Sequence, residues 1–178
     1  MKRLSQRCGG VFMRDKCKDL DALAIIVAQL KAQGKKIVHC HGCFDLMHPG
    51  HIKYFQAAKE MGDVLVVTVT PDQFVDKGPG RPVFNQTLRV ESIAALECVD
   101  YVAINKWSTA EETLRLLKPD FYVKGQEFQN LEDKTGKIQK ENDVVSQIGA
   151  KLAFTYEIVF SSTDLLNKYF KLRKNKLA

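Results

Sequence analysis

Two histidines, His48 and His51, stand on either side of a Pro-Gly pair, and the segment Gly42–Met47 leads into them. A Pro-Gly turn followed by helical spacing is typical of a helix start, where unpaired N–H groups and the helix dipole favour an anion. Imidazoles add directed N–H donors, and Gly50 has no side chain to keep a phosphate away from the main chain. The pattern therefore indicates phosphate binding, although isolated histidines at such places also cap helices or fill cores.

The hydrophobic pattern predicts the elements that carry this turn. The clearest strand is 64–69, whose continuous apolarity indicates burial on both faces of a sheet. Helices are expected where apolar residues recur at helical spacing. In chain order we expect a helix from 20 through 30 that ends at Gly34, a strand from 37 into Gly42, a helix from the 48–51 turn to Gly62, strand 64–69 and a loop over 71–82. There follow helix 85–96, strand 101–104, a helix that opens at 108–111 and ends near 118, strand 121–123, helix 143–148, strand 151–156 and a last helix from about 162.

Strand and helix alternate five times, which predicts an α/β fold: a doubly wound parallel sheet of about five strands with helices on both faces. In such sheets the ligand binds beyond the carboxyl ends of the strands, where the strand order reverses. The segments 40–51, 72–81 and 124–127, the loop after Tyr156 and the turn at 105–108 are expected there. Two further patterns predict local structure: 108–111 matches a helix capping box, and the polar run 126–140 predicts a long loop or an extra lobe.

Charge is concentrated at the two ends of the chain. The net charge of +6 comes from 27 basic and 21 acidic residues, but residues 1–18 hold six basic groups and one acidic group, and residues 171–178 hold four basic groups. We therefore expect a basic arm over 1–18, one domain over 19–170 and a basic tail over 171–178. Solvated ends explain this pattern better than a nucleic-acid-binding face.

No apolar run approaches the roughly 18 residues of a membrane span, and the first residues lack the apolar stretch of a signal peptide. These observations predict a cytoplasmic protein with no membrane partner. An odd number of cysteines, five, is then expected to consist of free thiols. Cys40 and Cys43 match Cys-x-x-Cys, but they end a strand rather than open a helix and have no convincing further zinc ligands, so redox or zinc chemistry is disfavoured.

The turn resembles a known signature. Gly-Cys-Phe-Asp-Leu-Met-His-Pro-Gly-His, residues 42–51, is similar to the Gly-x-Phe-Asp-x-x-His-x-Gly-His motif of cytidylyltransferase-like nucleotidyltransferases, and Phe160-Ser161-Ser162-Thr163 resembles their second motif. Within that superfamily the chain most resembles the nucleotidyltransferase domain of ADP-heptose synthases over about residues 19–170. The shared segments are 32–38, Lys77-Gly78-x-x-Arg81-Pro82-Val83 and Val123-Lys124-Gly125.

Glycerol-phosphate cytidylyltransferases are also similar, with fewer shared details. The chain departs from the heptose enzymes at three places: His41 stands where they usually have Asn, no Arg follows the Ser-Ser-Thr motif, and the 126–140 segment is longer than expected.

The resemblance implies a Rossmann-like nucleotidyltransferase fold and a set of site residues. The expected catalytic residues are His48, His51, Lys77 and Lys124. The expected nucleotide-binding residues are Gly42, Cys43, Phe44, Asp45, Gly50, Arg89, Ser161, Ser162 and Thr163, and the expected substrate-binding residues are Asp72, Arg81 and Gly125. Asp45 is expected either to orient a histidine or to contact Mg²⁺ bound to the triphosphate. By spacing alone, Arg89 and Arg81 also fit solvated arginines, and Asp72 fits a turn residue.

The implied reaction is attack by a substrate phosphate oxygen on the α-phosphorus of a nucleoside triphosphate. We expect adenylyl transfer to a heptose-like sugar 1-phosphate, with cytidylyl transfer to a polyol or alcohol phosphate as the alternative. A non-catalytic nucleotide-binding module and a nucleic-acid-binding protein are the alternatives of other classes. The resemblance also implies a homodimer, and fusion to or pairing with a sugar kinase.

Overall fold

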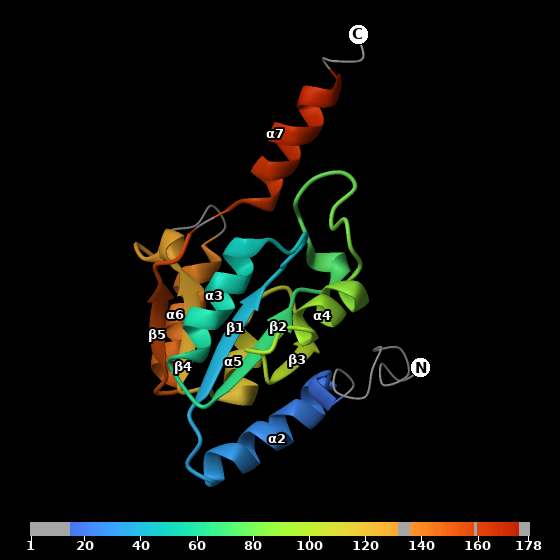
Figure 1. The fold of residues 1–178 in the computed structure, drawn as a ribbon. Coiled ribbons are helices and arrows are strands. Elements are labelled where there is room, and N and C mark those ends of the chain that lie inside the picture. The colour runs from blue at the N-terminus through green and yellow to red at the C-terminus, as the bar shows by residue number, and fades with distance from the viewer. Residues whose placement is uncertain (1–14, 132–135, 159, 175–178) are drawn as a thin grey trace.

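The structure, a computed structural model, describes residues 15–131, 136–158 and 160–174, so most of the expected arm and tail lie outside it. Five parallel strands form one sheet in the order β3-β2-β1-β4-β5 (Figure 1). The strands are β1 (Ile37–Gly42), β2 (Val64–Val69), β3 (Tyr101–Ile104), β4 (Phe121–Gly125) and β5 (Lys151–Thr155). This confirms the predicted fold class.

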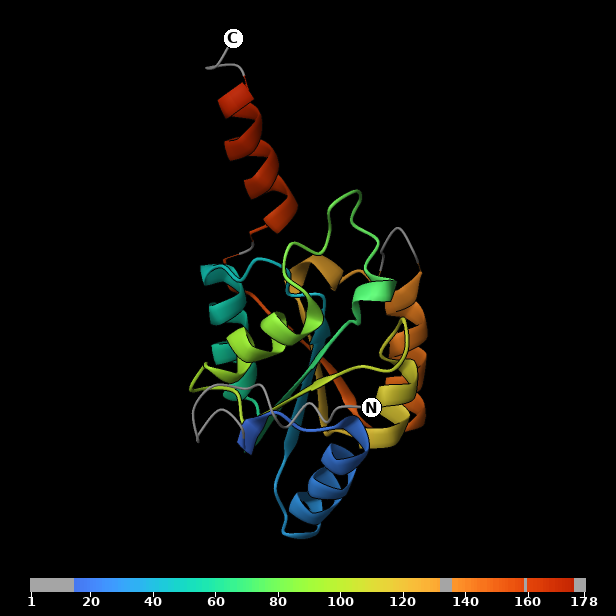
Figure 2. The same cartoon turned by 90° about the vertical axis from the view of Figure 1, so that its right-hand side faces the viewer.

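Helices cover both faces of the sheet, as Figure 2 shows. One face is covered by α3 (Pro49–Lys59) and α4 (Gln86–Ala94), which pack their apolar side chains on β1 and β2. The other face is covered by α2 (Leu20–Ala32), α5 (Glu111–Leu117) and α6 (Lys137–Gln147). The last helix, α7 (Ser162–Lys174), stands beyond the strand ends. In the part of the chain that the structure describes, no helix combines the length and apolarity that a membrane crossing requires.

Strand β1 lies at the point where the strand order reverses. It pairs with β2 on one side and β4 on the other, so that Cys40 lies level with Val67 and with Val123. All six residues of β2 are buried, in agreement with the apolar run in the sequence. Because the chain leaves β1 in one direction and later returns on the other side, the carboxyl ends of β1 and β4 border one crevice.

Side-chain caps fix the starts of three helices. Asp19 accepts from the Asp21 N–H before α2, Asn85 accepts from the Leu88 N–H before α4, and His48 caps α3. The predicted capping box at 108–111 is wrong. Helix α5 has Ala110 at its N-cap with no side-chain cap bond, and a carboxylate on α6, that of Glu141, accepts the Ala110 N–H instead.

The segment 126–140 is not only a loop. It begins with a 3-10 turn, η3 (Gln126–Phe128), and α6 starts at Lys137, six residues before the expected helix start at 143. Another 3-10 turn, η2 (Asp72–Phe74), lies within the expected 71–82 loop. Of the expected N-terminal arm, residues 15–18 lie on the domain: the Lys18 N–H donates to the Val102 carbonyl oxygen at 3.0 Å, and Lys16 Nζ donates to that of Leu96 at 2.8 Å.

Two histidines of β1 are buried and share one hydroxyl group. His39 Nε2 and His41 Nδ1 lie 2.8 Å and 2.9 Å from Thr68 Oγ1. Burial is the main cause that lowers the pKa of each imidazole to about 3, and the nearby charge of Lys124 acts in the same direction. Both rings are therefore neutral in the folded protein at physiological pH.

These histidines should make the fold acid-sensitive. Below pH 6.5 the unfolded chain binds protons that the folded chain refuses, so the free energy of unfolding should fall as pH drops from 6.5 towards 3. Each histidine contributes up to about 1.4 kcal/mol per pH unit in that window. Urea titrations at pH 7, 6 and 5 measure the slope, which should be smaller in His39→Gln. A slope that is identical in the two proteins would contradict the assignment for His39.

Close packing at the turn between α3 and β2 supplies a second prediction. A Cβ at Gly62 would lie 2.7 Å from Val38 Cγ2 and 2.9 Å from the Lys36 carbonyl oxygen. Gly62→Ala should therefore reduce the free energy of unfolding by about 1–3 kcal/mol in urea denaturation. Gly34→Asn is the control, because a Cβ there meets nothing within 4 Å and Asn tolerates the left-handed φ of 81°. Equal losses in the two variants would contradict this account.

Candidate active site

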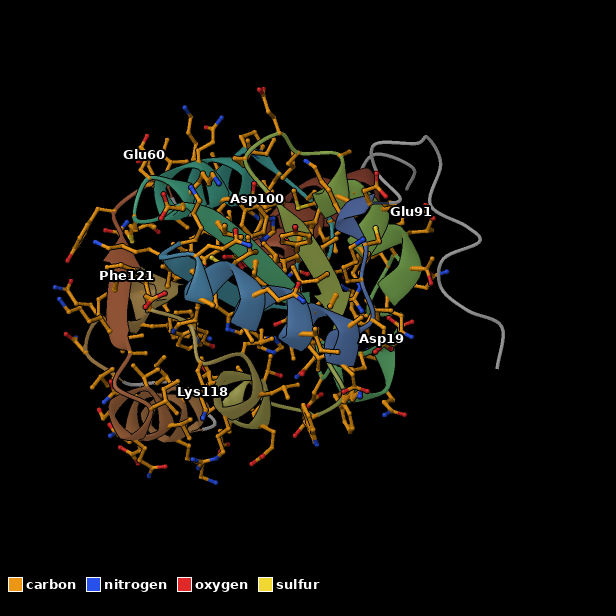
Figure 3. The ribbon with its side chains drawn as sticks, turned by 90° about the horizontal axis from the view of Figure 1, so that it is seen from below. Asp19, Glu60, Glu91, Asp100, Lys118 and Phe121 are labelled. Carbon is orange, nitrogen blue, oxygen red and sulfur yellow. The ribbon has the colours of Figure 1, made fainter. Side chains whose placement is uncertain are left out.

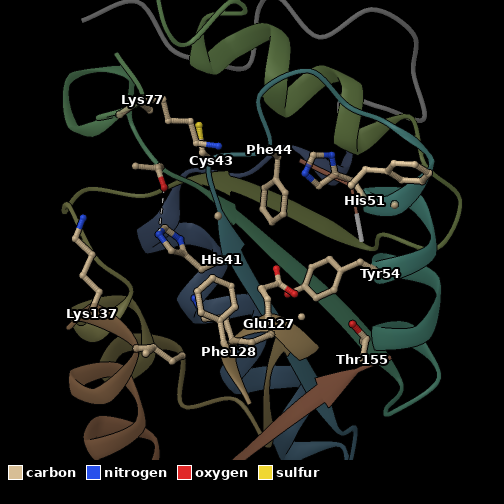
Figure 4. Close-up of a pocket in the computed structure, with 18 of the residues that line it drawn as sticks. His41, Cys43, Phe44, His51, Tyr54, Lys77, Glu127, Phe128, Lys137 and Thr155 are labelled. Atoms are coloured by element: carbon tan, nitrogen blue, oxygen red, sulfur yellow. Dashed lines mark hydrogen bonds between the residues drawn. The ribbon is translucent and has the colours of Figure 1, made fainter. Parts of the chain in front are cut away.

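A pocket of about 450 Å³ opens at the carboxyl ends of β1 and β4, beside the first turn of α3 (Figure 4). More than half of the residues expected from the sequence line it. They are Gly42, Cys43, Phe44, His48, Gly50, His51, Lys77, Lys124 and Gly125. The signature turn, the lysine loop and the end of β4 are thereby brought to one cavity.

The two signature histidines stack on each other at the start of α3. Their ring centroids lie 3.7 Å apart, with 16° between the ring planes. His48 Nδ1 accepts the His51 N–H, so the proton of a neutral His48 ring is on Nε2. That buried Nε2 and His51 Nδ1 have no hydrogen-bond partner among the described residues. Burial lowers the pKa of both rings, that of His51 to about 3. The pair consists of neutral imidazoles with polar atoms left for a ligand.

Gly50 is required by close packing between distant segments. A Cβ at this position would lie 3.0 Å from the Ile158 carbonyl oxygen and 3.1 Å from Phe160 Cδ2. The start of α3 and the segment before α7 thus approach each other so closely that a side chain at position 50 would require its neighbours to shift, and both border the pocket.

Asp45 joins the signature turn to two other segments. Its fully buried carboxylate accepts Arg81 Nε at 2.6 Å and the N–H groups of Val83 and Phe84 at 3.0 Å and 3.2 Å. Ser162 Oγ donates to the Asp45 carbonyl oxygen at 2.7 Å, which ties α7 to the same turn. Burial raises the pKa of Asp45, but hydrogen bonds from Val83 and Arg81 outweigh this and hold the pKa below its ordinary value.

Asp45 does not fit the expected metal ligand in this arrangement. Its carboxylate has no exposed surface and already accepts three donors. The described residues contain no cluster of three or more His, Cys, Asp or Glu side chains that could hold a metal ion. Asp45 also makes no bond to a signature histidine; it holds the 81–84 segment instead.

Arg89 and Asp72 form a second connection, next to the pocket rather than lining it. The Arg89 guanidinium, only 1% exposed, pairs with Asp72 at 2.7 Å. It also donates to the carbonyl oxygens of Cys43, Thr70 and Phe84. Arg89 therefore holds together the loops that follow β1 and β2, and its expected contact with a nucleotide stays a prediction, as does that of Asp72 with the substrate.

The residues of the second motif begin α7. Ser161 Oγ accepts the Asp164 N–H at 3.2 Å, and Thr163 Oγ1 lies 3.4 Å from Arg81 Nη1. Ser161, Ser162 and Thr163 do not line the pocket, whereas Ile158 and Phe160 just before them do. Their expected role as triphosphate ligands is left as a prediction, and so is the substrate contact of Arg81, whose Nε is held by Asp45.

The pocket also contains residues to which the sequence analysis assigns no role. His41 lies on one wall with Phe128 and Lys137, across the pocket from His51 in Figure 4. Glu141 pairs with Lys124 at 2.8 Å, and Tyr54 donates to the Val123 carbonyl oxygen at 2.6 Å. Lys137 and Glu141 were missed because the polar pattern of 126–140 hid the start of α6. For His41 the sequence did give a signal, because this histidine stands where the resembling family has Asn.

Comparison with known proteins agrees with this geometry. Residues 39–168 match the model of the cytidylyltransferase-like family. The chain is 41% identical to the bifunctional protein HldE of Geobacter metallireducens over 159 residues, which cover 88% of this chain and 31% of that protein. For the bifunctional protein HldE of Nitratiruptor sp. the identity is 41% over 75% of this chain and 29% of that protein. The chain thus spans about a third of the length of these relatives.

Solved structures give the same result for the fold. A lipopolysaccharide core biosynthesis protein from Thermoplasma volcanium aligns with a TM-score of 0.57 and 28% identity, covering 71% of this chain and all of that one. Pantoate-beta-alanine ligase from Francisella tularensis aligns with a TM-score of 0.56 and 19% identity, over 88% of this chain and 78% of that one, and supports the fold alone. The match over residues 39–168, with the signature histidines at its pocket, shows that this chain belongs to the cytidylyltransferase-like family of nucleotidyltransferases.

Proposed function

We propose that this chain transfers an adenylyl group from ATP to a heptose-like sugar 1-phosphate and releases pyrophosphate. The observation that carries the proposal is the stacked His48–His51 pair, whose unpartnered ring nitrogens lie in a pocket that also contains Lys77 and Lys124. The similarity to bifunctional HldE proteins and to a lipopolysaccharide core biosynthesis protein supports a sugar as acceptor.

The reaction needs charge stabilisation and positioning more than proton transfer. A phosphate oxygen of the acceptor attacks the α-phosphorus, the new P–O bond forms, and the bond to the β-phosphate oxygen breaks so that pyrophosphate leaves with its electron pair. A phosphate monoester is mostly dianionic at neutral pH because its second pKa is about 6, so no general base is required. The protein supplies N–H donors and ammonium groups around the anionic transition state.

Each pocket group has a place in this scheme. His48 Nε2–H and the partner-free His51 nitrogen suit triphosphate oxygens at the start of α3, where the helix dipole adds to the attraction. Lys77, on the loop after β2, and Lys124, at the end of β4, suit the phosphates that meet at the reacting bond. Mg²⁺ would enter with the triphosphate and shield its charge, and no step is assigned to a protein ligand of it.

Transfer of a cytidylyl group to a polyol or alcohol phosphate is the second candidate, which the name of the matching family favours. The greater length of the relatives and their description as bifunctional support fusion to, or pairing with, a sugar kinase. Assembly as a homodimer, which the resemblance implies, and a cytoplasmic location, expected from the sequence, are also part of the proposal.

Pyrophosphate release with ATP and with CTP, each combined with sugar 1-phosphates and polyol phosphates, tests the proposal. We expect release with ATP and a sugar 1-phosphate, reduced about 10²–10³-fold in His51→Ala because one preorganised donor is lost. Lys53→Ala, an exposed position on the same helix, should keep the wild-type rate. Release only with CTP would favour the second candidate, and triphosphate binding without any release would favour a non-catalytic module.

The pH dependence separates positioning by the histidines from base catalysis. With a His51 pKa of about 3, the ring does not titrate between pH 5 and 8. The value of kcat/KM should therefore fall about tenfold per pH unit only below the acceptor pKa of about 6, where the phosphate takes up a proton. His51→Asn should lower the plateau and leave the midpoint in place. A midpoint that moves in His51→Asn would assign the titration to the histidine and contradict this mechanism.

A further inference from the structure

Glu141 is a buried acid on α6 that none of the comparisons assigns to the reaction. Its side chain is 4% exposed, and three groups converge on it, one from the start of α5 and two from β4. Oε1 accepts the Ala110 N–H at 3.2 Å, while Oε2 accepts the Tyr122 hydroxyl at 2.8 Å and pairs with Lys124 Nζ at 2.8 Å. The carboxylate thus joins α6, the start of α5 and β4.

The Lys124 ammonium is fixed by more than this pair. Its side chain is 12% exposed, and Nζ lies 4.9 Å from the ring centroid of Tyr122 and 5.5 Å from that of Phe128. Two aromatic faces and one carboxylate therefore hold the charge at the pocket wall. Burial and the charge of Glu141 raise the pKa of Tyr122 well above its ordinary value, so the tyrosine stays a hydrogen-bond donor to the acid.

We propose that Glu141 is a positioning residue for Lys124: it holds the ammonium at the reacting end of the pocket and supplies the counter-charge with which a substrate phosphate must compete. This inference rests on the proposed function, which places Lys124 next to the phosphates at the reacting bond. Both oxygens of Glu141 are already engaged, Oε1 by the Ala110 N–H and Oε2 by the Tyr122 hydroxyl and Lys124 Nζ. It acts through the lysine.

Two effects of opposite sign follow when the charge is removed. Glu141→Gln keeps the shape and an oxygen for the Ala110 N–H, but it leaves the ammonium without its counter-charge. A phosphate should then bind more tightly, by roughly 3- to 10-fold, because it no longer competes with a carboxylate. The turnover number should fall about tenfold or more, because misplacement of a reacting group by about 1 Å can cost up to 10²-fold.

Glu141→Asp separates charge from position. The shorter side chain keeps the negative charge but withdraws it from Lys124. Phosphate affinity should stay within about twofold of the wild type, while kcat falls as it does in Glu141→Gln. A residue with only a structural role would lower the melting temperature in both variants without splitting affinity from kcat.

The decisive experiment is a double-mutant cycle with Lys124→Met. Binding of inorganic phosphate is measured by calorimetry, and pyrophosphate release gives kcat and KM. In the Lys124→Met background, Glu141→Gln should change neither phosphate affinity nor kcat. Equal effects of Glu141→Gln with and without Lys124, or weaker phosphate binding in Glu141→Gln, would overturn the proposal.

Asp100→Asn is the matched control. Asp100 pairs with Lys59 at 2.5 Å and accepts the Leu65 N–H at 2.7 Å. Like Glu141, it combines an ion pair with a lysine and a hydrogen bond from a main-chain N–H. It lies before β3, at the end of the sheet opposite the pocket (Figure 3). Its loss should cost stability and leave both phosphate affinity and kcat unchanged. If wild-type protein releases no pyrophosphate, the proposed function fails, and the phosphate-binding arm of the cycle still supports or overturns the role of Glu141.

Discussion

The buried carboxylate of Asp45 is the contact on which the geometry of the pocket depends. The carboxylate accepts hydrogen bonds from Arg81 and from two main-chain N–H groups. The main-chain carbonyl oxygen of Asp45 accepts a hydrogen bond from the Ser162 hydroxyl. Its neighbours Phe44 and Leu46 have φ values of 50° and 56°, a conformation that costs energy for residues with side chains. A tight turn of this kind persists because several long-range bonds determine it together.

The pocket combines neutral imidazoles with the charged side chains of Lys77 and Lys124. The signature histidines are neutral because burial disfavours their charged form, so in the proposed reaction they would act as directed hydrogen-bond partners without net charge. The lysines supply the charge, and at Lys124 that charge is balanced by Glu141. A site built in this way can exchange one anion for another without leaving a buried charge unpaired.

The sequence predicts best those helices and strands in which burial follows a regular pattern along the chain. Strand β2 was bounded correctly because all its residues are buried, and the signature turn was located because its residue types are unusual together. Hydrogen bonds and ion pairs between residues far apart in the sequence could not be predicted from it. Arg89 and Asp45 bind loops that lie 17 to 46 residues away in the sequence, and no local pattern predicts these contacts. Their expected contacts with a nucleotide stay predictions. Helix α6 was placed too late because few of its residues are apolar.

The bond between Ser162 and Asp45 spans 117 residues of chain. Contacts of such sequence separation form late, since a long loop must close before they contribute. During synthesis the strands of the sheet leave the ribosome before α7 does, so the sheet can pair while the signature turn still lacks one of its supports. The nascent domain would therefore pass through a stage with an assembled core and an incompletely held pocket, and the competent site would appear only when the last helix docks.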